Sequence, residues 1–240
     1  MLEFLVRAYN DTHRRIQYIK FEESNFLHST IISLYATIIE QTDSAILLLS
    51  KNKLPAAQIL LRSTLEAFID LINLVDDPDY IDQMRASYHK EWLKLSTAGT
   101  TGDDPFLEPY KSEELTLAIA HQQESMDALK ARGIKPMLIE DKFTKAGMLG
   151  IYKSVYNLLC AVSHNNIRAL VSHHVKLTGK KIDVVIFQDI DAGDFLATSR
   201  SFASIYLDAG LVVHEHFGSR EAEALLHYRN QLYAMSPEEA

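Results

Sequence analysis

The segment from Pro55 to about Leu74 has apolar side chains on nearly every side of a helix, which limits the folds open to the chain. On a helical wheel at about 100° per residue, these positions leave almost no side uncovered: Leu60, Leu61, Leu65, Phe68, Ile69, Leu71 and Ile72. Such a helix is stable only when other helices surround it. The sequence therefore predicts a multi-helix bundle.

Most of the remaining chain also follows helical spacing. Apolar residues at steps of three and four predict a helix over 27–49, and further helices are expected after Pro78, over 112–131 and 151–163, and after 191 and 218. The turn formers of Thr97–Pro109 indicate a loop. Two short β-prone runs around Gly179 predict a hairpin within 172–187. We expect an all-α fold with one short β-hairpin, forming a single domain over residues 1–240.

Composition and charge exclude several functional classes. A net charge of −8 argues against a general polyanion-binding surface, although a small basic cleft is compatible with it. The single cysteine, Cys160, allows no intramolecular disulfide, which is typical of a reducing compartment. No segment approaches about 18 uninterrupted apolar residues, so we expect a soluble cytoplasmic protein with no membrane contact.

Residues typical of cofactor and metal sites do not occur in the expected patterns. The chain has no glycine-rich phosphate loop, no nucleophile elbow and no dinucleotide fingerprint. The histidine pairs at 173–174 and 214–216 lack the His-Glu-x-x-His spacing of a zinc site. We therefore expect no cofactor and no bound metal.

Within the apolar helix, Arg62 and Glu66 stand one turn apart and form the first candidate site. One interpretation is a solvent-facing ion pair, which contributes under about 1 kcal/mol to stability. The other is a charged pair held inside the bundle, which must be almost completely hydrogen-bonded because a lone buried charge costs several kcal/mol. Buried pairs of this kind are candidates for functional sites.

A second candidate segment runs from Tyr156 to His164. Tyr156, Cys160 and His164 share one helical stripe at steps of four. The polar residues Ser163 and Asn165 flank the histidine and indicate that the helix ends there, which places the imidazole at a helix terminus. A histidine beside an apolar face is commonly structural, and a free cysteine commonly serves as a small buried apolar residue.

Together these two segments resemble a family of bacterial helical proteins that is known only as a domain of unknown function. Its members share a leucine-flanked Arg-x-x-x-Glu helix and a later Tyr-x-x-Leu-Ser-x-x-x-His segment. Here they correspond to Leu60–Glu66 and Tyr156–His164, with Cys160 in place of the serine. The resemblance extends over about residues 29–170.

That family in turn resembles the HEPN superfamily of compact helical bundles, many of which are metal-independent ribonucleases of toxin–antitoxin and antiphage systems and dimerise across the active site. The superfamily hallmark is an arginine followed four to six residues later by a histidine. Arg168 and His173 match this spacing, although the polar residue that usually follows the arginine is replaced by Ala169. Arg7 with His13 also fits this spacing, and Arg220 is followed by His227 seven residues later.

Two functions follow as hypotheses. In the first, the resemblance implies a homodimeric ribonuclease or nucleotide-handling protein, with Arg62, Glu66, Tyr156 and His164 as the catalytic residues. Arginine would stabilise charge on a phosphate, and histidine would transfer a proton near neutral pH. In the second, Arg62, Glu66, Tyr156 and His164 form a structural polar network within a non-catalytic helical module that binds a partner protein or a small ligand.

Overall fold

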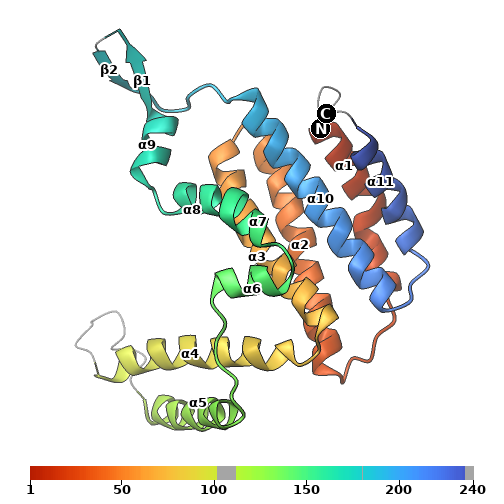
Figure 1. The fold of residues 1–240 in the computed structure, drawn as a ribbon, viewed down its shortest axis with the longest axis vertical. Helices are drawn as coiled ribbons and strands as arrows, with labels where there is room; N and C mark the ends of the chain where they lie inside the picture. Colours follow the sequence, from red (N-terminus) through yellow and green to blue (C-terminus); the bar gives the residue numbers. More distant parts are fainter. Residues whose placement is uncertain (102–111, 180, 236–240) are drawn as a thin grey trace. The chain divides into compact units, whose positions relative to one another are not determined.

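The computed structural model describes residues 1–101, 112–179 and 181–235 (Figure 1). Over these residues the chain is almost entirely helical, with one two-stranded antiparallel sheet, as the sequence predicts. In chain order the elements are α1 (Leu2–Thr12), the 3-10 helix η1 (His13–Tyr18), α2 (Phe26–Ser50), α3 (Leu54–Asp76), α4 (Tyr80–Thr101), α5 (Glu113–Ala131), α6 (Ile139–Lys145), α7 (Leu149–Ile151), the π turn η3 (Tyr152–Tyr156), α8 (Asn157–Ser163), α9 (Ile167–His174), β1 (Val175–Thr178), β2 (Lys181–Val184), α10 (Ala192–His216) and α11 (Ala222–Ala234).

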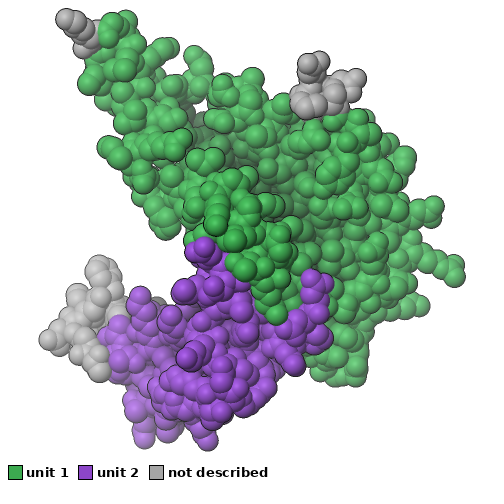
Figure 2. Space-filling model, viewed as in Figure 1, with its two compact units in different colours: residues 1–75, 143–240 green, residues 76–142 purple. Residues whose placement is uncertain are grey.

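The chain divides into two compact units, coloured separately in Figure 2. Unit 1 comprises residues 1–75 and 143–240, and unit 2 comprises residues 76–142. The first boundary coincides with the end of α3, where Asp76 and Asp77 precede Pro78. Pro78 disfavours helical geometry at the residue before it, so the chain turns there before α4 begins.

The core of unit 1 forms around α10, which lies between α2 and the pair α1 and α11 (Figure 1). Tyr35, Phe202 and Tyr206 are among its largest fully buried side chains. Close packing at this crossing requires a glycine, because a Cβ on Gly210 would lie 2.9 Å from the Tyr35 hydroxyl. The helices of this core therefore lie in a fixed register.

Helix α2 is long and apolar enough to cross a membrane. It is 25 residues long with a mean hydropathy of 1.3, and among the described helices it alone meets the length and composition of a membrane-crossing segment. Its side chains at Ile31, Ile38 and Leu49 are buried inside unit 1. The side chain of Asn25 caps its first turn by accepting hydrogen bonds from two backbone N–H groups.

Unit 2 is a helical hairpin of α4 and α5 with a small core. The buried side chains Ala86, Met126 and Leu129 pack between the two helices. Asp82 is buried and pairs with Arg132 at 2.6 Å, which connects the start of α4 to the residue after α5. This ion pair and the apolar core together hold the two helices antiparallel.

Two boundaries differ from the sequence prediction. The loop predicted over Thr97–Pro109 begins later, because α4 continues to Thr101; the hydroxyl of Thr100 hydrogen-bonds to helix carbonyls, so this polar stretch remains helical. The part of that loop at 102–109 lies outside the described residues. The hairpin predicted within 172–187 is confirmed, but its first strand begins only at Val175, because α9, whose start is capped by the side chain of Asn166, extends through His174.

Candidate functional site

Arg62 and Glu66 form an ion pair along one turn of α3. The Arg62 Nη2 and Glu66 Oε1 atoms lie 2.9 Å apart, and the two side chains are 28% and 34% exposed. The pair is therefore neither fully exposed nor fully buried, and it lies at the edge of the bundle. One side of it faces solvent and the other faces the segment that carries Tyr156.

Tyr156 and Cys160 complete a network that we call the arginine cluster, defined by Arg62, Glu66, Tyr156 and Cys160. The Tyr156 hydroxyl donates to Glu66 Oε1 at 2.6 Å and accepts from Arg62 Nη2 at 3.1 Å. The Arg62 Nε–H donates to Cys160 Sγ at 3.3 Å. The Arg62 guanidinium carbon also lies 5.4 Å from the centre of the Tyr156 ring, within the range of a cation–π interaction.

Tyr156, which bonds to Arg62 and Glu66 on α3, is the last residue of a π turn. Residues 152–156 form a single π turn, and such turns are frequent at functional sites. The Tyr156 ring is 3% exposed and packs against Phe143 and Tyr152, with ring centroids 5.0 and 5.5 Å away. The aromatic contacts bury the ring and leave only its hydroxyl directed at the charged pair.

His164 occupies the end of α8, as the flanking polar residues predict. It follows Ser163, the last residue of α8, and Asn165 then takes a positive φ of 50° that turns the chain away. The His164 side chain is exposed, and no side-chain hydrogen bond or ion pair joins it to the arginine cluster among the described residues; its backbone N–H donates to the Cys160 carbonyl at 3.0 Å. The structure thus joins Arg62, Glu66 and Tyr156 by hydrogen bonds and an ion pair, whereas the His164 side chain makes no such bond to them.

Tyr156 and Arg62 both have raised pKa values. Burial raises the pKa of Tyr156, and the hydrogen bond to the Glu66 carboxylate and its negative charge raise that pKa further. Burial acts to lower the pKa of Arg62, but its hydrogen bonds to Cys160 and Tyr156 and the charge of Glu66 outweigh this effect and raise the pKa. At neutral pH the tyrosine is therefore a hydrogen-bond donor and the arginine a cation.

The alternative pair, Arg168 and His173, lies on α9. Five residues along an α-helix correspond to a rotation of about 140°, so the two side chains leave the helix on different sides. Burial lowers the pKa of His173, and the neighbouring His174 lowers it further. His173 is therefore neutral at physiological pH, but the helix does not direct it toward Arg168.

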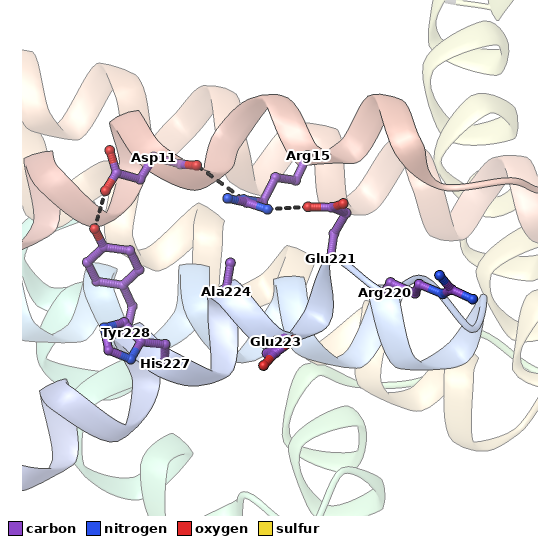
Figure 3. A pocket seen from close by; sticks show the side chains of 8 residues that line it. All are labelled: Asp11, Arg15, Arg220, Glu221, Glu223, Ala224, His227 and Tyr228. Carbon is purple, nitrogen blue, oxygen red and sulfur yellow. Dashed lines mark hydrogen bonds and ion pairs between the residues drawn. The ribbon is translucent and has the colours of Figure 1, made fainter.

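A groove of about 750 Å³ between α1 and α11 contains residues that the sequence analysis did not select as a site (Figure 3). Tyr228 donates a hydrogen bond to Asp11 across it, and Arg15 pairs with Glu221. Figure 3 shows Arg220 and His227 at opposite ends of the groove, so the structure does not join this arginine to this histidine. This hydrogen bond and this ion pair connect the α11 segment to α1 and η1.

Metal binding has no candidate in the part of the chain that the structure describes. No group of three or more His, Cys, Asp or Glu side chains is arranged to hold an ion there. Cys160, the one thiol, is half-buried beside Arg62 and serves as a hydrogen-bond acceptor.

The fold and the site define an all-helical protein with a partly buried arginine–glutamate–tyrosine cluster and a small protruding hairpin. Residues 28–182 match a family of unknown function (DUF5677), and the chain belongs to that family. The matched range contains both segments that form the arginine cluster, and it confirms the expected membership of an uncharacterised family. No curated protein and no solved structure matches the chain.

Proposed function

We propose that this protein is a non-catalytic helical binding module of the cytoplasm. The arginine cluster has a structural role in this proposal, because Arg62, Glu66, Tyr156 and Cys160 are joined in a single hydrogen-bonded set. A buried tyrosine hydroxyl left without partners would destabilise the fold, so the complete network favours a structural role. The two hydrogen bonds of the buried Tyr156 hydroxyl, to Glu66 and from Arg62, are the observation that carries the proposal.

The segment held by the cluster continues directly into the surface that would bind a partner. On α9 the side chains of Ile167, Leu170 and Val171 are exposed at helical spacing, so they form one apolar stripe. The hairpin that follows adds further exposed apolar side chains. Contiguous exposed apolar surface is typical of protein–protein contacts, so the expected ligand is a protein.

A metal-independent ribonuclease of the HEPN type, acting in a toxin or antiphage system, is the second candidate. Arg62 and Glu66 keep about a third of their side-chain surface exposed, so a phosphate or ribose could reach them. In this function the arginine would stabilise phosphate charge, and His164 would supply the proton transfer. His164 follows Cys160 by one helical turn, and its exposed side chain is not hydrogen-bonded to the cluster, so a bound substrate would have to bridge Arg62 and the imidazole.

RNA cleavage in the presence of EDTA separates the two functions. The purified wild type would be compared with Arg62→Ala, His164→Ala and His173→Ala, together with their melting temperatures. The binding module predicts no cleavage by any sample, a lower melting temperature for Arg62→Ala, and an unchanged one for the exposed His164→Ala.

Other outcomes would replace this proposal. Chelator-resistant cleavage that disappears in Arg62→Ala and His164→Ala, with the circular dichroism spectrum retained, would establish the ribonuclease. Cleavage lost only in His173→Ala would assign the activity to α9.

A further inference from the structure

The hairpin has one apolar face and one polar face. Its register pairs Val175 with Val184 and Leu177 with Ile182, so these four side chains share one face of the two-stranded sheet. The alternate pairs, Lys176 with Asp183 and Thr178 with Lys181, occupy the opposite face. Successive side chains of a strand point to opposite faces of the sheet, so the apolar and the polar side chains of the hairpin lie on different faces.

The polar face is internally paired, whereas the apolar face is uncovered. On the polar face Asp183 pairs with Lys181 at 2.9 Å and accepts a hydrogen bond from Thr178 at 3.3 Å. On the apolar face Leu177 is 71% exposed, Ile182 67% and Val184 82%. Figure 1 shows the hairpin projecting from α9, clear of α10. An isolated two-stranded hairpin is marginally stable in water, so this face needs a covering partner.

We infer that the partner is a second copy of this chain, bound hairpin to hairpin through these apolar faces. The inference rests on the proposed binding function and names its partner. Two sheets pack face to face at about 10 Å, with their inner side chains interdigitated. In this arrangement the lysines of each copy lie on the outer faces, so like charges do not meet. The apolar face contains no charged residue, so two copies of it can pack together without burying a charge.

The exposed apolar area of the hairpin reaches the lower limit of the area that a specific dimer interface buries. β2 ends at Val184, the Val185 N–H still bonds to the His174 carbonyl, and Ile186, the next residue, is also exposed. Four exposed aliphatic side chains supply roughly 500 Å² per copy, and two copies reach the ~1,000 Å² total that marks a specific interface. A closed twofold contact also leaves no free apolar face for further association.

Burying this face against a membrane is a different arrangement that the hairpin disfavours. The turn that would enter a lipid surface first carries Thr178 and Gly179, which are not apolar anchors. The apolar side chains lie on the broad face of the strands. A flat partner surface of the same shape fits them better than a lipid interface does.

Sedimentation velocity of the full chain tests the inference. We expect a dimer for the wild type at about 10 µM. Leu177→Lys places a charge in the apolar face and should raise the dissociation constant at least about 100-fold, giving a monomer with an unchanged circular dichroism spectrum. Thr178→Lys places the same charge one residue away on the polar face and should leave the dimer intact.

A wild type that stays monomeric up to about 100 µM would overturn the inference. So would a dimer that persists in Leu177→Lys or one lost equally in both variants. These outcomes are separate from the RNA assay: a monomer that cleaves no RNA and is destabilised by Arg62→Ala would refute the hairpin dimer alone.

Discussion

Replacing Tyr156 by phenylalanine isolates the contribution of one hydroxyl to the arginine cluster. The ring keeps its packing against Phe143 and Tyr152, while the bond to Glu66 at 2.6 Å and the bond from Arg62 at 3.1 Å disappear. Hydrogen bonds to charged groups stabilise proteins by about 1.5–3 kcal/mol. The lower value applies here, because Arg62 and Glu66 stay paired and water can reach them.

We therefore expect Tyr156→Phe to lose about 1.5 kcal/mol of unfolding free energy, or about 4 °C in melting temperature for a chain of this length. Urea denaturation followed by circular dichroism measures the first quantity, and a thermal scan measures the second. Tyr152→Phe is the matched control, because its hydroxyl makes no hydrogen bond to any described residue while its ring belongs to the same aromatic group. Equal stability of the two variants would refute the structural role given to the Tyr156 hydroxyl.

Burial lowers the pKa of His214 to about 4, below the ~6.5 of an unfolded histidine, so the folded chain binds fewer protons between these pH values. Unfolding free energy should fall by about 3 kcal/mol as the pH drops from 6.5 to 4, and His214→Gln should lose this dependence; equal slopes in urea titrations would contradict it. Gly210→Ala places a Cβ 2.9 Å from Leu225 and from Tyr35 and should cost about 2 kcal/mol. Gly150→Ala meets nothing within 4 Å and should stabilise its helix by about 0.5 kcal/mol, so thermal shifts of the same sign in both glycine variants would contradict the packing argument.

Much of the fold could be predicted because apolar spacing records which side of each helix is buried. The helix expected over 27–49 is α2, and the segment from Pro55 to about Leu74 is α3. The hairpin was predictable because a turn around Gly179 separates two β-prone runs, and this glycine takes a positive φ of 64°. These elements could be predicted because they depend on residues close together in the sequence.

The candidate site was predictable only in part. A stripe at steps of four linked Tyr156 to Cys160, and both residues contact Arg62 in the structure. The π turn that ends at Tyr156 could not be predicted from apolar spacing, because a single such turn does not change which residues are apolar. Whether His164 hydrogen-bonds to Arg62 is a tertiary property that the stripe at steps of four does not decide, and the structure shows the imidazole exposed at the end of α8. The groove beside α11 was missed because the residues that pair across it, Asp11 with Tyr228 and Arg15 with Glu221, are more than 200 positions apart in the sequence.

Hydrogen exchange tests most directly the claim that the arginine cluster holds the binding segment in place. In Arg62→Ala the backbone amides of α8 and α9 should exchange faster than in the wild type, while those of α10 and α11 should keep their rates, because the substitution removes only contacts of Arg62 to Glu66, Tyr156 and Cys160. Unchanged exchange throughout α8 and α9 would contradict the account, since the cluster would then contribute nothing to the position of that segment.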